Sequence, residues 1–167
     1  MLKCLLLSAV VSAFTAQIWA QDRSLPLFLI ERSTNANVIH YEVQVTRDGR
    51  LDLRQPVIAY WVMAAEDGRR QPLNVLERTR AYGFTIRSDG SNDSYTMNLV
   101  SYGRRPIHVY SKDGMVHAET TIGGRRAFLT KIFITTRKSW LLNEPVSAEL
   151  YGTDVVTGER CYEKVSA

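Results

Sequence analysis

Cysteine is almost absent from this chain, and its scarcity limits how the fold can be held together. The two cysteines are Cys4 and Cys161, and Cys4 lies in an N-terminal segment that we expect to be removed. One remaining cysteine excludes an internal disulfide, so stability must come from core packing. Cys161 alternates with Tyr162 in a strand-like pattern, and no histidine lies near it in sequence to activate it. We therefore expect a buried structural thiol, with a bond to a second chain as the alternative.

Long apolar runs are absent beyond the N-terminus. The first 20 residues combine a positive charge at Lys3, an apolar run and a small residue, Ala20, at the end, which is the layout of a secretory signal. The alternative is a membrane anchor, but the run is shorter than the roughly 20 apolar residues of a spanning helix. We expect residues 1–20 to be a signal peptide. Residues 21–167 then form a single β-rich domain that is periplasmic or extracellular and has no integral membrane span.

Strong charge and the common catalytic motifs are also lacking. The net charge is +4, removal of Lys3 lowers it by one, and the arginines form scattered pairs between apolar segments. Proteins that bind nucleic acids or membrane surfaces usually concentrate positive charge on one stripe of the surface. Nucleic acid is therefore not an expected partner. No Ser-His-Asp order, glycine-rich phosphate loop or paired-carboxylate motif is present. Whether the chain is an enzyme stays open, with the pattern leaning against it.

What the chain does contain is a succession of short strand patterns separated by turn residues. The predicted strands cover residues 27–30, 38–46, 57–64, 84–87, 95–102, 107–112, 115–121, 126–137, 146–151 and 159–165. One segment differs, because Leu73, Leu76 and Arg80 recur at near-helical spacing behind the start signals Asn74 and Glu77. The sequence predicts an all-β fold of about ten strands with one short helical insertion near 73–81. A single antiparallel β-barrel and a closed β-sandwich both fit.

Two turns carry information on register. The Asp113-Gly114 pair predicts a two-residue hairpin, which places His108 directly opposite Glu119 and brings His117 to the same face. Two imidazoles and a carboxylate could bind zinc or a similar ion, or they could be the solvated face of an ordinary hairpin. At Asp48-Gly49, by contrast, a two-residue turn would pair apolar with charged side chains. A longer loop there, or separate pairing of the two flanking strands, is therefore predicted.

Aromatic residues and one polar corner suggest where a ligand would bind. Barrel interiors with partly polar rings can hold a small apolar or amphipathic ligand, and the alternative is that these rings are simply core. The candidate rings are Tyr41, Tyr60, Trp61 and Tyr82, and the candidate polar groups are Glu31, Arg32, Asn35, Asn37, Glu77 and Arg78. The asparagines between 31 and 38 favour a turn stabilised by its own side chains. That corner is a structural lock, or it presents a charged pair to a ligand.

Four stretches resemble the signature of a secreted bacterial family described only as a domain of unknown function. They are E-R-S-T-N-A-N-V-I-H-Y (31–41), P-V-I-A-Y-W (56–61), P-L-N-V-L-E-R-T-R-A-Y-G (72–83) and E-L-Y-G-T-D-V-V-T-G-E-R-C-Y-E-K (149–164). The resemblance implies secretion and one β-rich domain, and it supplies no catalytic residues. It also implies that the candidate residues within these stretches are shared by the family for structural or functional reasons.

Three functional hypotheses follow. The first, which we favour because the motifs hold stacking and hydrogen-bonding groups without a nucleophile–base pair, is a binding module for a small apolar or amphipathic ligand or a cell-envelope partner. The second is a metal-dependent hydrolase that uses His108, His117 and Glu119. The third is a structural envelope protein. No cofactor is expected apart from the metal ion of the second hypothesis.

Overall fold

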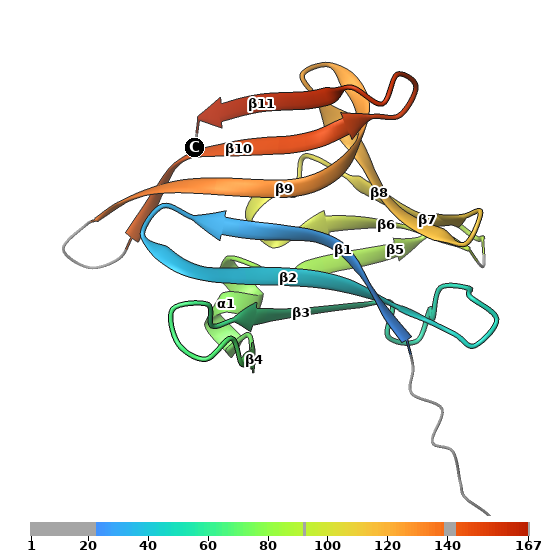
Figure 1. The fold of residues 1–167 in the computed structure, drawn as a ribbon, viewed down its shortest axis with the longest axis horizontal. Coiled ribbons are helices and arrows are strands. Elements are labelled where there is room, and N and C mark those ends of the chain that lie inside the picture. Colours follow the sequence, from blue (N-terminus) through green and yellow to red (C-terminus); the bar gives the residue numbers. More distant parts are fainter. Residues whose placement is uncertain (1–22, 92, 139–142, 167) are drawn as a thin grey trace, which may run out of the picture.

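The computed structural model describes residues 23–91, 93–138 and 143–166. The predicted signal peptide, residues 1–20, lies outside them. The described chain forms one eleven-stranded sheet with a short helix and a 3-10 turn (Figure 1). None of its helices has the length and apolar character to cross a membrane.

The elements follow one another with short connections. In chain order they are β1 (Arg23–Arg32), β2 (Asn35–Val45), β3 (Val57–Val62), β4 (Arg70–Pro72), α1 (Val75–Arg80), β5 (Phe84–Ser88), β6 (Ser94–Leu99), η1 (Val100–Tyr102), β7 (Ile107–Lys112), β8 (Met115–Ile122), β9 (Arg125–Lys138), β10 (Asn143–Asp154) and β11 (Arg160–Ser166). Their order in the sheet is β4-β3-β2-β1-β9-β8-β7-β6-β5, and β10 pairs with both β9 and β11.

The long strand β9 joins two arms of the sheet. One edge of β9 pairs with β10 along residues 127–138. The other edge pairs antiparallel with β8 at residues 125–128 and parallel with β1 at residues 131–134. The sheet therefore forks at β9, and strands β1–β4 form one arm while β5–β8 form the other (Figure 1).

The fork needs a glycine in the neighbouring strand. The register between β9 and β10 shifts after Tyr151, where a bulge bends the strand. A Cβ atom at Gly152 would lie 2.5 Å from the Phe128 carbonyl oxygen and 2.7 Å from the Ile122 side chain. Only glycine lets the two strands come this close.

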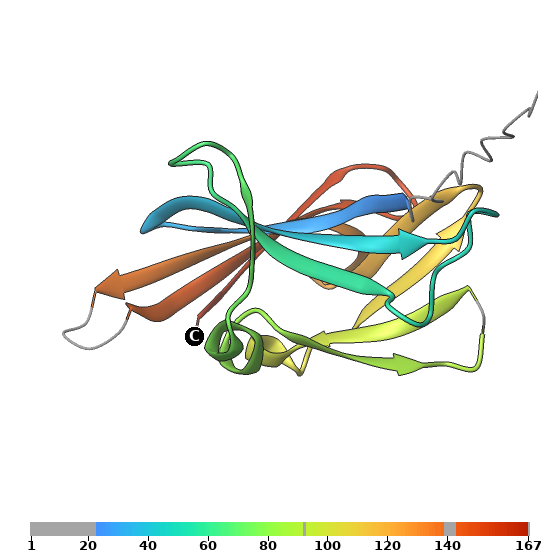
Figure 2. The same ribbon diagram turned by 90° about the horizontal axis from the view of Figure 1, so that it is seen from below.

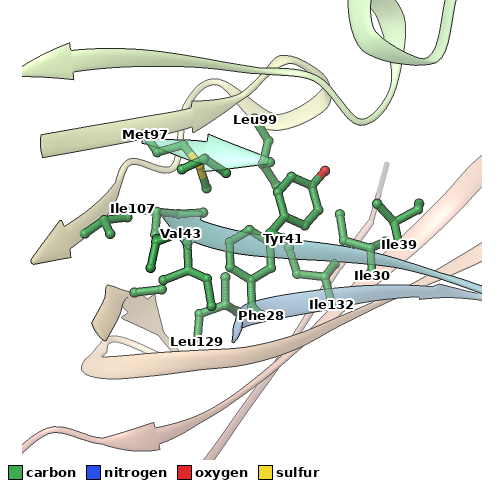
Figure 3. Packing of buried hydrophobic residues seen from close by; sticks show 14 of the residues in the cluster. Phe28, Ile30, Ile39, Tyr41, Val43, Met97, Leu99, Ile107, Leu129 and Ile132 are labelled. Atoms are coloured by element: carbon green, nitrogen blue, oxygen red, sulfur yellow. The ribbon is translucent and has the colours of Figure 1, made fainter. Parts of the chain in front are cut away.

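The core lies between the two arms. Tyr41 and Val43 of β2 meet Met97 and Leu99 of β6, and side chains from β1, β7 and β9 complete the layer (Figure 3). Cys161 packs into the same cluster at 2% exposure, which confirms the expected buried thiol. The alternation of inward apolar and outward polar residues in β2 produces this arrangement, because a strand turns successive side chains to opposite faces.

The all-β prediction with one short helix is confirmed, whereas the predicted closure is not seen. The sheet curls into a half-barrel, and its two end strands, β4 and β5, are not paired with each other in the described chain. The strand pairs are antiparallel, as an antiparallel fold predicts, with one exception in the described chain: β1 and β9 run parallel. Alternation reveals the buried face of a strand but not its partner, so neither feature was visible in the sequence.

Both turn predictions are confirmed. Lys112 faces Met115, His108 faces Glu119, and Asp113 and Gly114 both have positive φ, as a two-residue hairpin turn requires. The loop after β2 is longer, since the Thr46 N–H donates to the Arg50 carbonyl and Val45 bridges to Leu51. Two elements differ from expectation: β4 is too short for a periodic pattern, and residues 100–102, predicted as strand, form the turn η1.

Candidate functional site

Arg32, the last residue of β1, holds its charge against two aromatic rings. Its guanidinium carbon lies 4.5 Å from the centre of the Trp61 ring and 5.6 Å from that of Tyr82. Arg32 Nη1 donates a 3.0 Å hydrogen bond to the Tyr82 hydroxyl, and the two rings meet edge to face with centroids 5.5 Å apart. Both rings are buried and Arg32 is half-buried. Cation–π contact and the hydrogen bond together hold the guanidinium in one place.

Tyr41 supports this cluster from the core. Its hydroxyl donates a 2.6 Å hydrogen bond to the Tyr82 carbonyl, and its ring stacks on Phe28 at 4.5 Å. At 1% exposure Tyr41 cannot touch a ligand, so it positions Tyr82 and does not line the site. Burial raises the pKa of the Tyr82 hydroxyl, which therefore keeps its proton at neutral pH.

A cleft of about 500 Å³ opens beside the cluster. We call it the Arg32 cleft. It is lined by Arg32, Leu76, Glu77, Arg80, Ala81, Tyr82, Ser101, Ile134, Thr136 and Pro145. The cleft thus lies between α1 and the ends of β9 and β10, which Figure 2 shows at the same end of the molecule. Ile134 enters the lining because it is the parallel partner of Arg32 in the sheet.

An apolar crevice of about 150 Å³ adjoins the cleft. The two hollows share Ser101, Ile134 and Pro145 in their walls. From there the crevice continues past Ile30 and Leu150, which belong to the core. The two hollows are therefore neighbours: charged side chains line the Arg32 cleft, whereas uncharged and mostly apolar side chains line the crevice.

The charges in the cleft are unequal. Arg32 and Arg80 carry two positive charges and Glu77 carries one negative charge. The Glu77 carboxylate caps α1, since Oε2 accepts from the Asn74 N–H at 2.8 Å while the Glu77 N–H donates to Asn74 Oδ1 at 2.9 Å. Within the described residues, no carboxylate oxygen lies within 4.0 Å of the Arg32 guanidinium nitrogens. Its Nε is buried without a hydrogen-bond partner.

The asparagines of the corner are structural. Asn35 Oδ1 accepts from the Asn37 N–H at 2.7 Å, and Asn37 Oδ1 accepts from the Ala65 N–H at 3.1 Å. Asn37 is buried, so this second bond ties the loop after β3 to the start of β2. The two side chains fix the corner at which Arg32 ends, and they do not line the cleft.

Glu31 and Tyr60 lie on the outer face of the sheet. Glu31 pairs with Lys131 at 3.2 Å. Tyr60 donates a hydrogen bond to Glu42, and its ring carries the Arg70 guanidinium at 4.6 Å. Burial, followed by the bond to Glu42, raises the pKa of Tyr60 to about 12. Because successive strand residues face opposite ways, these two side chains cannot join Arg32 and Trp61.

Helix α1 divides the remaining candidates. Glu77 faces the Arg32 cleft, whereas Arg78 lines a separate hollow beside β3 and β5. The sequence reasoning missed Arg80, although it follows Leu76 and Glu77 at helical spacing and so shares their face. The contributions of Ile134 and Pro145 had no sequence signal, since they depend on the parallel pairing of β1 with β9.

The predicted metal residues are neighbours but are engaged elsewhere. Glu119 Oε1 accepts from Arg126 at 2.6 Å and Oε2 accepts from Tyr110 at 2.9 Å, and the Arg126 bond lowers the pKa of Glu119. His117 stacks on Phe128 at 4.4 Å, and His108 Nδ1 lies 3.3 Å from a threonine hydroxyl. Across residues 23–91, 93–138 and 143–166, no three such side chains are grouped to hold a metal ion. The geometry therefore gives the metal hypothesis no support.

Comparison with known proteins identifies a family. The family model described as "Domain of unknown function (DUF4833)" matches residues 28–164. Neither the curated proteins nor the solved structures contain a match to the chain. The matched range includes all four of the quoted sequence stretches and every residue that lines the Arg32 cleft. The chain therefore belongs to the DUF4833 family, as its sequence motifs predicted.

Proposed function

We propose that this protein is an exported binding module for a small amphipathic ligand. The ligand places its apolar part in the crevice and its polar part in the Arg32 cleft. One observation carries the proposal: a mostly apolar crevice without charged residues adjoins a cleft with charged residues, and the two share part of their walls. Small-molecule sites are typically concave and mostly apolar, with a few fixed polar groups and volumes of roughly 300–1,000 Å³. Export rests on the N-terminal sequence pattern.

The size of the crevice limits the apolar part. An apolar cavity of roughly 150 Å³ can hold a molecule such as benzene, so a chain of several carbons or one ring fits. Each buried methylene contributes about 0.8 kcal/mol. The crevice then gives micromolar or weaker affinity unless the cleft adds polar contacts.

A second candidate is a docking site for a cell-envelope partner. Leu76 is 62% exposed and Val75 is 72% exposed on α1, and Val146 of β10 is 43% exposed. Exposed apolar side chains near a cleft are typical of protein contacts. Leu76 lines the cleft itself and Val146 follows Pro145 of its wall, so a partner would cover the same hollow.

Native mass spectrometry of chain purified after export tests the proposal. We expect an N-terminus at Gln21 and a non-covalent mass excess of small-molecule size that is lost on denaturation. Ala148 lines the crevice and is half-buried, so Ala148→Phe should fill it and abolish the excess. Ala64 is exposed in a turn, so Ala64→Phe is the matched control and should retain the excess.

The outcomes separate the candidates. A mass excess that survives Ala148→Phe would place the ligand elsewhere and contradict the proposed site. If no excess is found and the chain instead co-purifies with a defined envelope protein in a manner that requires Leu76, the second candidate takes its place.

A further inference from the structure

We infer that the polar end of the ligand is a carboxylate and that Arg32 binds it, so that the ligand is a single-chain monocarboxylate. The inference rests on the proposed function and adds the chemical class of the ligand. It is carried by the charge, burial and unfilled hydrogen-bonding capacity of one side chain.

Other half-buried cations of this chain have a matching anion. Arg105 donates to Glu163 through both Nη atoms at 2.7 and 2.6 Å, and Lys131 lies 3.2 Å from Glu31. Arg32 is half-buried too, yet within the described residues it has no carboxylate within 4.0 Å. A cation that is partly removed from water without a counter-ion is unfavourable. An anion in the cleft would compensate for that cost.

The guanidinium also has donors to spare. It carries five N–H groups, and in the described chain only Nη1 has a protein partner, the Tyr82 hydroxyl. Nε is buried without any partner. The Tyr82 hydroxyl accepts from Arg32, and it keeps its own proton at neutral pH because burial raises its pKa. Arg32 and Tyr82 therefore form a pair of donors in the wall of the cleft, suited to the two oxygens of a carboxylate.

The position of these donors is fixed before a ligand arrives. The Trp61 ring holds the guanidinium at 4.5 Å, and the Tyr41 hydroxyl holds the Tyr82 backbone at 2.6 Å. Preorganised donors bind more tightly than mobile ones because less side-chain freedom is lost. Arg80, which is exposed on the rim, adds positive charge at longer range.

The charge balance favours a monoanion. Glu77 lines the same cleft as Arg32 and Arg80, so the three charges sum to one positive charge. A second negative charge on the ligand, as in a phosphate monoester near neutral pH, would face Glu77. A carboxylate joined to a short alkyl chain fits both the single net charge and the small crevice.

Isothermal titration calorimetry with three ligands of equal carbon number tests the inference at pH 7. Octanoate, 1-octanol and octyl phosphate each have eight carbon atoms, one of which is the carboxylate carbon in octanoate, and they carry different head groups. We expect octanoate to bind at least about tenfold more tightly than octanol, since hydrogen bonds to a charged group are worth that much. Octyl phosphate should bind no more tightly than octanoate.

Two matched variants locate the effect. Arg32→Gln should weaken octanoate binding about tenfold and so remove the preference for octanoate over octanol, and thermal unfolding shows whether the variant is folded. Arg78→Gln is the control, because Arg78 lies on α1 but lines a different hollow. It should keep the full preference.

Each result has a distinct meaning. Binding of neither octanoate nor octanol to the unaltered chain would refute the proposed function itself. Equal binding of the two would leave the proposed function standing and overturn the inference, and this comparison needs no variant. A preference that survives Arg32→Gln would overturn the role of Arg32, and tighter binding of octyl phosphate would overturn the carboxylate class.

Discussion

In the part of the chain that the structure describes, Arg105, unlike Arg32, is bound by a carboxylate of its own chain, that of Glu163. Besides its two bonds to Glu163, Arg105 Nη1 donates to the Thr121 carbonyl at 2.7 Å, and Glu163 accepts from the Gly123 N–H at 2.8 Å. These contacts tie β11 to the turn between β8 and β9 and to the segment that precedes β7. Hydrogen bonding to Arg105 lowers the pKa of Glu163 to about 2.

The Arg105–Glu163 pair should make stability depend on pH. The pKa of Glu163 is about 2 in the folded chain, below the ordinary value of 4.5 that applies to an unfolded chain. Folding therefore favours the ionised carboxylate. Its contribution is fully present above about pH 5 and is lost as the pH falls toward 2. At pH 7, Glu163→Gln should lower the free energy of unfolding by about 1–2 kcal/mol, allowing for solvent screening. The difference from the unaltered chain should vanish near pH 2.

Urea unfolding at pH 7, 4 and 2.5 measures this difference. Glu144→Gln is a suitable control, since Glu144 and its partner Arg137 are more than half exposed and 3.4 Å apart. The control should change stability by less than about 0.5 kcal/mol at every pH. A Glu163→Gln effect that stays constant from pH 7 to 2.5 would contradict the assigned ion pair.

At the scale of elements, the connection from α1 to β5 is the tightest backbone contact beside the site. A Cβ atom at Gly83 would lie 1.7 Å from the Arg78 carbonyl oxygen. Tyr82 directly precedes this glycine, and its N–H bonds to the Glu77 carbonyl at 2.7 Å. The close approach of Gly83 to the Arg78 backbone therefore fixes the position of Tyr82 in the wall of the cleft.

Gly83→Ala should destabilise the protein by about 3 kcal/mol or more, because the backbone of α1 must move to admit the methyl group. Gly103→Ala is the matched control: its nearest neighbour atom would be 3.9 Å away, and its φ is −64°. Thermal unfolding of both variants measures the effect. Equal melting temperatures for the two would show that α1 and β5 are less closely packed than described.

The sequence predicted elements well where local chemistry decides them. The Asp113-Gly114 turn set the register of β7 and β8, and the Asn74–Glu77 capping box marked the start of α1. It did not predict η1, because Tyr95 to Tyr102 continues a strand-like pattern past the end of β6. Nor did it predict β4, which is only three residues long and gains its structure by pairing with Tyr60 to Val62 of β3.

At the scale of the whole molecule, β9 connects both arms of the sheet through one edge. Ile132 lies on β9, belongs to the core and lines the apolar crevice (Figure 3). Because each arm contributes side chains to the same core, neither should retain its structure when the other opens. We expect a single cooperative unfolding transition.

Ile132→Ala tests this coupling. The change should cost about 2–5 kcal/mol, and hydrogen exchange of β2 and β7 amides should accelerate by the same factor, since both would exchange through global unfolding. Val156→Ala, at a side chain that is 87% exposed, should leave exchange unchanged. Loss of protection in one arm alone would show that the arms unfold independently.

The sequence predicted only those residues of the site that lie within short motifs. Three separate stretches of the sequence supplied four residues that the structure brings together. Arg32 contacts the rings of Trp61 and Tyr82, and Glu77 lines the Arg32 cleft. Glu31, Tyr60 and Arg78 were grouped with them because a motif does not say which face each residue occupies, whereas Tyr41 is too deeply buried and the asparagines are used in the corner itself. The apolar half of the hollow depends on pairings between distant strands, which periodicity does not reveal.

The parallel pairing of β1 with β9 also determines when the cleft can form during synthesis of the chain. Arg32 is made early during synthesis, but Ile134 and Pro145, which line the same cleft, are added only after most of the chain exists. A partly synthesised chain can form the β1–β2 hairpin without having any hollow beside it. If the cleft binds a ligand as proposed, only a polypeptide that extends past Pro145 can capture it, and occupancy of the cleft would distinguish such molecules from shorter truncated ones.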